Sequence, residues 1–589
     1  MEINEEGMDN APQYVGCMHK FPAHSMRSGL VHNSGGEGTL IAFGAFEEVP
    51  AFAPTPTTPD PQTVSQALEA PDADEWAAAM DNKITNMLHL GVFREIPCPD
   101  DKNIITPKWV FCRKFKDGLL VKHKACLVAR GFSQVSGIDY HNTYLYAPVV
   151  RLESFRVLIS IAALFDLEVH QFDVSTAYLH GDIDGEVYME PPPGYQTEGT
   201  IWILLKGLYR LKQAGRIWYE RLKANMNTLG FTQCPRNHAV FSIGTWGSDD
   251  WAVCAFWVDD ETGIGSRWQL DRVAAMFHRK YSITGEGELR WILGMGVTCD
   301  LHTHTISLSQ ESYIDSLVEK FGLQHANTIT TPLAPGAILS KDQCPTSPEE
   351  RLDMIGNTYC ELIGSLQYAA LATRPDISYA VGRLAQFLTN PGHAHMEAAL
   401  RVLQYLKGMK TCTLNLGGTI PDIAGFSDSD WGGARDDRKS IGAYVFRIGD
   451  GAVSWKSKKQ NSVALSSVEA EYMAMCQAAK EAVWLTGLLE DLGLDRQAPL
   501  VIFGDNQGAL ALAQNPVFHL RSKHIAIQYH FTRELVHMQQ IVVKYIPMKV
   551  MLADALTKSL PRPQHAMLVE WIGVHRKDNK KLYLNDKGE

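Results

Sequence analysis

The chain has 589 residues, of which 45% are hydrophobic and 21% charged, and its formal net charge is −11. This balance is ordinary for globular domains and excludes a wholly disordered chain. At about 150 residues per domain, the length predicts three or four domains. The acidic total argues against nucleic-acid binding through overall charge, because phosphate contacts depend on Lys and Arg. The total does not exclude a local basic groove, since clustered metal-binding carboxylates also make the net charge more negative.

The N-terminal 72 residues contain runs of Gly, Pro, Ser and Thr without sustained periodicity. This composition predicts a disordered leader over residues 1–72. Residues 1–10 lack the basic and then apolar pattern of a signal peptide, and no run of about 18 apolar residues predicts a membrane span. The eleven cysteines include no C-x-x-C pair, which favours reduced intracellular thiols over a disulfide framework or a zinc site.

Regular elements are predicted from residue 73 onward. Trp76, Met80, Ile84 and Met87 recur at helical spacing and predict an amphipathic helix. Residues 108–112 and 125–129 are β-rich and predict a hairpin with a turn at Lys116-Asp117-Gly118. Further predicted elements are a helix at 155–164, a strand at 168–173 and a strand at 251–258 that ends at Asp259-Asp260.

The rest of the chain changes in character near residue 322. Residues 322–355 are rich in Thr, Pro, Ala and Ser and predict an extended linker, after which helical patterns occupy 359–406. A β-meander over 423–455, a helix capped by Ser466-Ser467-Val468-Glu469 and a strand at 500–503 follow. This order predicts a self-contained α/β domain over 420–565.

Acidic residues at predicted strand ends form two groups, one on each side of the linker. The first group is Asp173, Asp259 and Asp260, and the second is Asp428, Glu471, Asp505 and Asp554. Two-metal phosphoryl transfer needs several carboxylates around both ions, since Mg²⁺ prefers oxygen ligands. Asp is also common in solvated turns, and a buried acid can be purely structural. The local pattern of each acid leaves both interpretations open, and the sets favour metal binding.

Basic and aromatic residues alternate in one segment and predict a surface that contacts phosphates and stacks bases. The segment contains Lys206, Leu208, Tyr209, Arg210, Leu211, Lys212, Arg216, Trp218, Tyr219 and Arg221. An amphipathic helix with a charged outer face is an equally simple interpretation. Lysines on the early hairpin are candidates for holding a triphosphate, or they protect an exposed strand edge. His519, His524 and His530 have no Cys or carboxylate at metal-ligand spacing.

The chain closely resembles the polymerase and ribonuclease H portion of a copia-type retrotransposon polyprotein, over residues 75–570. In the first half the motifs are Lys108-Trp109-Val110, Leu127-Val128-Ala129-Arg130-Gly131-Phe132, Gln171-Phe172-Asp173-Val174, Ala177-Tyr178-Leu179-His180-Gly181-Asp182, Val187-Tyr188-Met189-Glu190-Pro191-Pro192-Pro193-Gly194-Tyr195, Leu211-Lys212-Gln213-Ala214, Val258-Asp259-Asp260 and Gly287-Glu288-Leu289. Later motifs are Gly364-Ser365-Leu366-Gln367-Tyr368, Thr373-Arg374-Pro375-Asp376, Ser427-Asp428-Ser429-Asp430-Trp431, Ser466-Ser467-Val468-Glu469-Ala470-Glu471-Tyr472, Asp505-Asn506, Ser522-Lys523-His524-Ile525 and Ala553-Asp554.

The resemblance implies a multidomain α+β and α/β fold, with a right-hand polymerase of palm, fingers and thumb followed by a linker and a ribonuclease H-like domain. The expected divisions are a leader at 1–72, reverse transcriptase fingers and palm at 73–321, a connection or thumb-like helical region at 322–419, the ribonuclease H-like domain at 420–565 and a C-terminal tail at 566–589.

The resemblance also implies roles for single residues. Asp173, Asp259 and Asp260 match the polymerase acids, and Asp428, Glu471, Asp505 and Asp554 match the ribonuclease H quartet. These seven are the expected catalytic and metal-binding residues, with two Mg²⁺ ions, or Mn²⁺, at each site. Lys124, Arg130 and Gln213 are the expected nucleotide- and template-binding residues.

Three features depart from the family pattern. Trp257 stands where Tyr is usual, Cys126 replaces a common Arg, and Glu261-Thr262-Gly263 is more polar than the usual apolar strand. The integrase, protease and capsid portions expected upstream are missing, so we expect a fragment or a degraded genomic copy that keeps all seven acids.

The expected activity is RNA-directed DNA synthesis with ribonuclease H cleavage of RNA/DNA hybrids. Expected partners are an RNA template, a DNA primer, the hybrid, dNTPs and other retrotransposon proteins such as capsid and integrase, with no membrane. The expected location is the cytoplasm, in the retrotransposon particle, with a nuclear fraction. Two alternatives remain: a decayed relic that only binds nucleic acid, and a structural or capsid-associated protein without a substrate.

Overall fold

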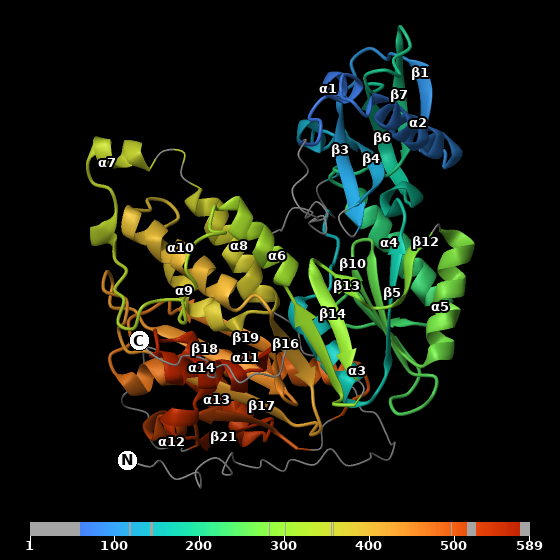
Figure 1. Cartoon of the computed structure of the whole chain (residues 1–589). Coiled ribbons are helices and arrows are strands. Elements are labelled where there is room, and N and C mark those ends of the chain that lie inside the picture. The colour runs from blue at the N-terminus through green and yellow to red at the C-terminus, as the bar shows by residue number, and fades with distance from the viewer. Residues whose placement is uncertain are drawn as a thin grey trace.

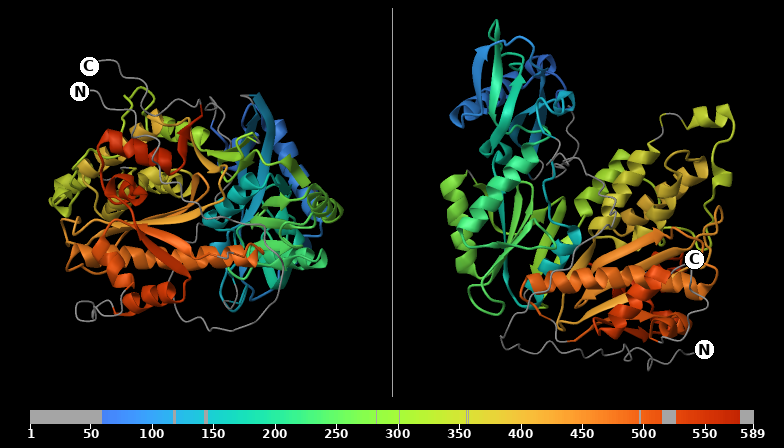
Figure 2. Two further views of the ribbon diagram at one scale, coloured as in Figure 1. Left: turned by 90° about the horizontal axis from the view of Figure 1, so that it is seen from below. Right: turned by 180° about the vertical axis from the view of Figure 1, so that it is seen from behind.

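The computed structural model describes residues 59–577, except 117–118, 142–144, 282, 301, 355, 357, 496–497 and 515–525. Figure 1 shows a lobe of sheet and helix at the N-terminal end, a sheet domain below it, a group of helices and a C-terminal α/β domain. The right-hand view of Figure 2, from behind, shows the N-terminal lobe and the helical group rising as separate arms from the two sheet domains. Most of the predicted leader lies outside the described residues.

The N-terminal lobe corresponds to the expected fingers. It combines a four-stranded sheet, in the order β1-β7-β6-β2, with the separate two-stranded hairpin β3-β4. The helix predicted from residue 73 is confirmed, and Trp76, Met80, Ile84 and Met87 are all buried. The elements are α1 Val64–Leu68, α2 Ala73–His89, β1 Phe93–Pro97, β2 Ile104–Ile105, β3 Pro107–Lys116, β4 Leu119–Ala129, η2 Gly131–Ser133, β6 Asp182–Met189 and β7 Thr200–Lys206. Within the predicted hairpin turn, Asp117 and Gly118 lie outside the described residues.

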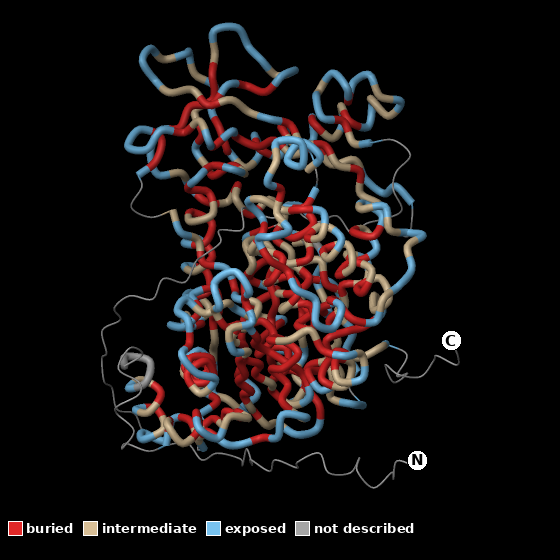
Figure 3. The backbone as a smooth tube through the Cα atoms, turned by 90° about the vertical axis from the view of Figure 1, so that its left-hand side faces the viewer, coloured by how far each residue is buried: buried red, intermediate tan, exposed pale blue. Residues whose placement is uncertain are grey.

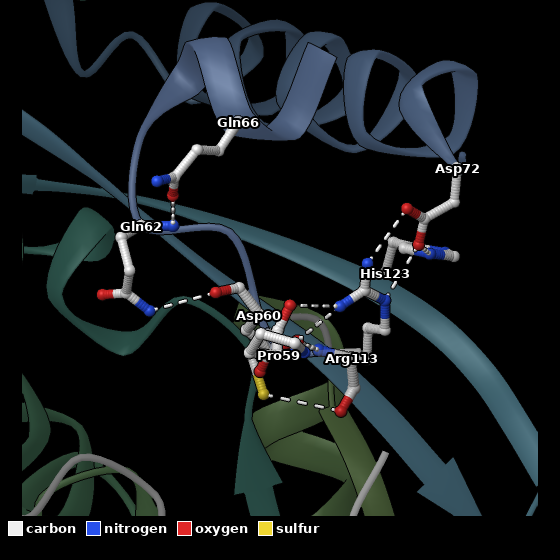
Figure 4. Close-up of polar contacts among 8 residues, drawn as sticks. Pro59, Asp60, Gln62, Gln66, Asp72, Arg113 and His123 are labelled. Atoms are coloured by element: carbon white, nitrogen blue, oxygen red, sulfur yellow. Dashed lines mark hydrogen bonds and ion pairs between the residues drawn. The ribbon is translucent and has the colours of Figure 1, made fainter. Parts of the chain in front are cut away.

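The folded lobe begins before the predicted end of the leader at residue 72. Arg113 on β3 is 7% exposed, and its guanidinium donates to both carboxylate oxygens of Asp72 at 2.9 and 3.0 Å. It also donates to Asp60 at 3.3 Å and to the carbonyl of Pro59 at 3.1 Å, as Figure 4 shows. A buried guanidinium needs such partners. The boundary at residue 72 is therefore wrong, because residues 59–72 supply the counter-charges of Arg113.

The expected palm is a six-stranded sheet in the order β12-β5-β11-β10-β9-β8. The predicted strands at 168–173 and 251–258 are confirmed as β5 and β10, and the predicted helix at 155–164 is confirmed as α3. The elements are α3 Leu152–Leu164, β5 Glu168–Val174, η3 Ala177–His180, α4 Ala214–Thr228, β8 Thr232–Gln233, β9 Val240–Ile243, β10 Ala252–Trp257, β11 Asp260–Gly265, α5 Arg267–Lys280 and β12 Ile283–Glu288.

A second sheet joins parts of the chain that the predicted boundaries separate. Its order is β13-β14-β15-β16-β22, in which β16 pairs with β15 on one side and with β22 on the other. Its strands are β13 Trp291–Ile292, β14 Met295–Asp300, β15 Thr305–Ser309, β16 Cys412–Gly417 and β22 Val574–Arg576. One hydrogen-bonded sheet therefore joins the expected regions on both sides of 321/322, 419/420 and 565/566. Residues 566–577 are folded and are not a tail.

The helical group occupies most of the region between β15 and β16. The predicted linker contains only two short helices, η4 and α7, among the described residues of 322–355. The helices predicted at 359–406 are confirmed. The elements are α6 Glu311–Lys320, η4 Lys341–Gln343, α7 Pro348–Asp353, α8 Tyr359–Ala372, η5 Pro375–Ile377, α9 Ser378–Leu384, η6 Ala385–Phe387 and α10 His393–Gly408.

The C-terminal domain is a mixed five-stranded sheet in the order β19-β18-β17-β20-β21. β17 pairs antiparallel with β18 and parallel with β20, so the sheet combines the predicted meander with an α/β half. Ser466 caps α11 as predicted, since its hydroxyl accepts from the amide of Glu469 at 3.2 Å. The elements are β17 Ile423–Ser429, β18 Ile441–Ile448, β19 Gly451–Lys459, α11 Ser467–Asp491, β20 Leu500–Gly504, α12 Gln507–Gln514, α13 Ala526–His537, β21 Ile541–Tyr545, η8 Met548–Val550, η9 Leu552–Leu556 and α14 Arg562–Trp571.

A continuous hydrophobic core joins the palm to the C-terminal domain. It contains buried residues of α3 and β10 together with residues of β15 to β20 and α11. Figure 3 shows the buried part of the tube concentrated in this lower region. Polar contacts reinforce it, because Trp251 donates to the carbonyl of Leu492 at 3.0 Å and Arg236 pairs with Asp491 at 2.7 Å. The palm and the C-terminal domain therefore share one packed interior.

The motif Thr373-Arg374-Pro375-Asp376 forms a buried ion pair at the end of α8. Arg374 and Asp376 are 0% and 1% exposed, and their closest contact is 2.6 Å. Tyr405 on α10 donates to Asp376 at 2.6 Å, and its hydroxyl lies 3.3 Å from Nε2 of His565 on α14. This network connects the helical group to the C-terminal domain, so the motif has a structural role here.

Replacing Arg374 by Met is expected to destabilise the chain by about 3–5 kcal/mol, because Asp376 would remain as a buried charge without its partner. The change is measured by chemical denaturation followed through tryptophan fluorescence. Lys410→Met is the matched control, since Lys410 pairs with Asp315 at 2.9 Å on the surface. Its cost is expected to stay below about 1 kcal/mol. Equal costs for the two variants would contradict the structural role of Arg374.

Candidate active sites

The three predicted polymerase acids meet at one end of the six-stranded sheet. Asp173 on β5 is the direct antiparallel partner of Asp260 on β11. Asp259 lies in the turn between β10 and β11, where its carbonyl accepts from the amide of Val174 at 3.3 Å. All three side chains are half-buried. The register of the sheet thus brings Asp173 to the same place as Asp259 and Asp260, which lie 86 or more positions later in the sequence.

The turn that carries Asp259 has a constrained backbone. Val258 has a φ of 62°, in the left-handed region that a β-branched residue rarely adopts. Trp218 on α4 donates its indole N–H to the carbonyl of Val258 at 2.6 Å. Such strain persists only when the surroundings enforce it. The contact with Trp218 therefore helps to fix the position of the acidic turn.

The predicted nucleotide- and template-binding residues lie in different environments. Lys124 is half-buried on β4 and Arg130 is exposed at the end of that strand. Gln213 is 2% exposed, and its amide donates to the carbonyl of Asp139 at 3.0 Å and accepts from Gln134 at 3.1 Å. The side chain of Gln213 therefore braces the 134–139 loop beside α4.

Lys83 is a basic residue near this surface that sequence reasoning missed. It lies on α2 with its ammonium 5.5 Å from the centre of the Tyr209 ring. Burial, followed by the charge of Lys124, lowers its pKa, while Cys126 opposes the shift. Lys83, Lys124 and Cys126 therefore share one environment. The position of Lys83 in a predicted helix did not indicate this shared environment, because the environment depends on how α2 packs against β4.

The acids of the C-terminal domain converge more tightly. Asp428 on β17, Glu471 on α11 and Asp505 after β20 each offer an oxygen, and these atoms lie within 4.8 Å of one another. In the part of the chain that the structure describes, this is the group of His, Cys, Asp and Glu residues that meets the spacing for a metal ion. Asp428 is 1% exposed and Glu471 is 8% exposed. Three of the four predicted acids are therefore brought together.

Asp554 joins the other acids through a lysine. It lies in η9, is 1% exposed and accepts from the ammonium of Lys558 at 2.6 Å. The same ammonium lies 3.3 Å from Oδ2 of Asp428. Thr557 donates its hydroxyl to that oxygen as well. Sequence reasoning missed Thr557 and Lys558, although their spacing of three and four residues after Asp554 places them one helical turn away.

Crowding of buried carboxylates raises their proton affinity. Burial, with the charges of Asp428 and Asp505, raises the pKa of Glu471 to about 10. Burial and the charge of Asp428 raise the pKa of Asp554 to about 7, against the effect of Lys558. The pKa of Asp505 is raised for the same two reasons. Burial would lower the pKa of Lys558, and the nearby Asp428 and Asp554 raise it instead.

The chemistry of this site fits a hard divalent cation. Oδ1 of Asp428 is buried and has no hydrogen-bond partner among the described residues. An unpaired buried carboxylate oxygen is costly unless a cation or a donor satisfies it. Mg²⁺ prefers oxygen ligands of this kind and would replace the missing partner. The polymerase acids share a sheet end but do not form such a compact group in the described structure.

Comparison with known proteins identifies the family. The family model described as "Reverse transcriptase (RNA-dependent DNA polymerase)" matches residues 91–335. The retrovirus-related Pol polyprotein from transposon TNT 1-94 of Nicotiana tabacum is 37% identical over 522 residues, which cover 88% of this chain and 39% of the relative. The putative transposon Ty5-1 protein of Saccharomyces cerevisiae is 30% identical over 315 residues, which cover 52% of this chain and 99% of the relative. The chain belongs to the copia-type retrotransposon Pol polyproteins.

The chain corresponds to only part of the length of its polyprotein relatives. The chain spans 39% of the length of the Nicotiana tabacum polyprotein. Among solved structures, a foamy viral protease-reverse transcriptase in complex with double-stranded DNA matches with a TM-score of 0.44 and 12% identity, over 80% of this chain and 70% of that chain. The multidomain α+β and α/β architecture is confirmed, with a region that matches the reverse transcriptase family before a C-terminal α/β domain. Within the described residues, every helix is too short or too polar to cross a lipid bilayer.

One departure from the copia-type pattern has a clear structural cost. Glu261 follows the acidic turn on β11 and is 2% exposed, and neither carboxylate oxygen has a hydrogen-bond partner among the described residues. Burial raises its pKa well above 4.5, and the Cys254 thiol, a weak donor, opposes the shift. An apolar side chain would avoid this penalty.

Glu261→Leu is therefore expected to stabilise the palm by about 1–3 kcal/mol, the usual cost of an unsatisfied buried polar group. Because the folded chain retains a proton that the unfolded chain releases, an additional ionisation penalty, absent below pH 4.5, grows as pH rises toward the raised pKa. Thermal unfolding at pH 5 and pH 8 measures the difference. Glu220→Leu, at an exposed position of α4, serves as the control. A gain at pH 8 no larger than that at pH 5 would contradict this account.

Binding of Mn²⁺ to the C-terminal acids is expected to release protons at pH 7.5, because Glu471, with a pKa of about 10, is protonated in the metal-free site. Calorimetry in PIPES and in Tris measures this release, since the two buffers differ in ionisation enthalpy. Asp505→Asn should weaken the binding. A binding enthalpy that is identical in both buffers would show that no proton leaves.

Proposed function

We propose that this chain synthesises DNA on an RNA template, and then on DNA, by adding nucleotides to a primer 3′-hydroxyl. In this proposal the C-terminal domain hydrolyses the RNA strand of the resulting hybrid. The observation that carries the proposal is the convergence of acids at two separate places, Asp173 with Asp260 and Asp428 with Glu471 and Asp505. Membership of the copia-type family supports the polymerase half.

At the first site, Asp173, Asp259 and Asp260 would hold Mg²⁺. The bound metal would supply charge neutralisation for the α-phosphate and would lower the pKa of the primer hydroxyl. The acids themselves act by position, since β5 and β11 are paired and the turn is braced by Trp218. A fixed carboxylate geometry reduces the reorganisation that the transition state requires.

Residues of the N-terminal lobe would bind the incoming nucleotide and the template. Lys124 and Arg130 offer positive charge to the triphosphate, and the nearby Lys83 adds to it. Gln213 contributes indirectly, because its buried amide holds the 134–139 loop through Asp139 and Gln134. Its proposed role is therefore that of a positioning residue.

At the second site, Asp428, Glu471 and Asp505 would hold Mg²⁺, and Asp554 would support them from η9. The bound metal would supply a nucleophilic water for hydrolysis of the RNA strand. Selection of RNA over DNA would come from the 2′-hydroxyl and from the shape of the hybrid. Because the raised pKa values reflect crowded negative charge, the site favours binding of a cation.

The proposed partners follow from this chemistry. They are an RNA template, a DNA primer, the RNA/DNA hybrid and dNTPs, with Mg²⁺ or Mn²⁺ as the metal ion. Capsid and integrase of the same element are further proposed partners. The proposed location is the retrotransposon particle in the cytoplasm, with a nuclear fraction.

A second candidate function is a decayed copy that binds nucleic acid without copying it. The buried carboxylate of Glu261, one residue after Asp260, is the observation that favours it. Primer extension on an RNA template distinguishes the two functions. The Cys126→Arg, Trp257→Tyr double variant is the positive control, and synthesis by this variant alone would support decay.

The two activities are expected to separate by mutation. Asp259→Asn should lower primer extension by about 100-fold or more and leave hybrid cleavage intact, whereas Asp505→Asn should do the reverse. We expect a loss of this size because removing even a residue that only supports a metal ligand lowers metal affinity or activity by about 10- to 100-fold. Gel assays of extended primer and of cleaved RNA measure both activities on the same preparation.

Asp249→Asn is the matched control, since Asp249 is an exposed acid in the loop before β10. It should change neither activity. The proposal is wrong if Asp259→Asn and Asp505→Asn both retain full extension and full cleavage.

A further inference from the structure

The acids of the C-terminal site divide into two parts. Asp428, Glu471 and Asp505 offer oxygens within 4.8 Å of one another, and Asp554 is not a member of this group. Asp554 is instead held by Lys558, whose ammonium lies 2.6 Å from its Oδ1. The site therefore has one part formed by carboxylates alone and one part that already contains a cation.

Asp428 belongs to both parts, and its two oxygens differ. Oδ1 is buried and has no hydrogen-bond partner in the described chain, so it is available to a metal ion. Oδ2 accepts from the hydroxyl of Thr557 and lies 3.3 Å from the ammonium of Lys558. A lysine ammonium has three donors, and two of them face Asp428 and Asp554 here.

We propose that Lys558 permanently takes the place of the second metal ion, so that the ribonuclease H-like site holds one divalent cation. This inference rests on the proposed function of the site. A two-metal site needs two ions about 3.5–4 Å apart that share a carboxylate. Lys558 occupies the shared carboxylate, Asp428, on its Oδ2 side, and it also occupies Asp554. The oxygens that a second ion would need are already bound.

The local fold holds Lys558 in this position. Lys558 follows η9 directly, its amide donates to the carbonyl of Asp554 at 3.2 Å, and its side chain is 33% exposed. Thr557, the preceding residue, is 1% exposed and is anchored on Asp428. The ammonium is therefore attached to a rigid turn. A fixed ammonium of this kind neutralises charge without exchanging with solution, and Lys558 acts as a positioning residue for Asp428.

The test counts bound ions in the full chain. Asp173, Asp259 and Asp260 are replaced by Asn in every sample, so that the polymerase acids do not contribute. Equilibrium dialysis against Mn²⁺ then gives the number of ions bound per chain, both in the protein that keeps Lys558 and in the Lys558→Met variant. The expected result is one ion with Lys558 and two with Lys558→Met, because the variant frees Asp554 and Oδ2 of Asp428.

Two further variants separate charge from folding. Lys558→Arg keeps the positive charge and should bind one ion. Lys549→Met replaces an exposed lysine on η8 and should also bind one ion. Without metal, Lys558→Met should unfold at a lower temperature than either control, because Asp428 and Asp554 then repel each other. Saturating Mn²⁺ should restore the unfolding temperature.

Each other outcome overturns the inference. If the chain with Lys558 and the Lys558→Met variant bind the same number of ions, either one or two, Lys558 does not occupy a metal position. The proposed function would still stand if the chain with the native polymerase acids cleaves the hybrid. No bound ion in either protein would instead remove the metal site itself and with it the proposed ribonuclease H function.

Discussion

Arg156 lies fully buried where α3 meets β19 and the end of α8. Its guanidinium donates to the carbonyl of Val453 at 2.8 Å and to the carbonyls of Leu371 and Ala372 at 2.8 and 3.1 Å. It also lies 3.9 Å from the centre of the Trp455 ring. Burial lowers its pKa to about 10, so the side chain still carries its charge at neutral pH. One cation thus connects the palm, the helical group and the C-terminal domain, and each of these parts depends on the others to satisfy it.

Other buried charged groups show the effect of having, or lacking, partners that satisfy the charge. Arg113 and Arg374 have carboxylate partners, and both stabilise the packing of segments distant in sequence. Among the described residues, one buried oxygen of Asp428 and both carboxylate oxygens of Glu261 have no hydrogen-bond partner. Asp428 lies beside Glu471 and Asp505, an arrangement that a cation satisfies, whereas the Cys254 thiol, a weak donor, lies beside Glu261. The same physical deficit therefore indicates a binding site in one place and a structural defect in the other.

Local sequence patterns predicted the elements well, because helix and strand periodicity depends on neighbours in the chain. The helix α2 and its four buried residues, the hairpin β3-β4 and the meander are examples. The convergence of Asp173 with Asp260 was left open by the strand-end pattern and was favoured by the family resemblance, since pairing register is not visible in a single strand. The boundaries at 72 and 565 were wrong for a related reason. Arg113 and β22 fold against partners far away in sequence, and no local pattern reports such contacts.

The pairing of β22 with β16 has a consequence for how the protein is made. β16 lies between β15 and β22, a strand of only three residues that is synthesised after the other elements of the C-terminal domain. Domains of long chains usually mature one after another as they emerge. Here the sheet next to the palm cannot close until the elements of the C-terminal domain, from β17 to α14, have been synthesised. A nascent chain halted before Val574 would leave β16 as an open edge, a surface on which unfinished copies can aggregate.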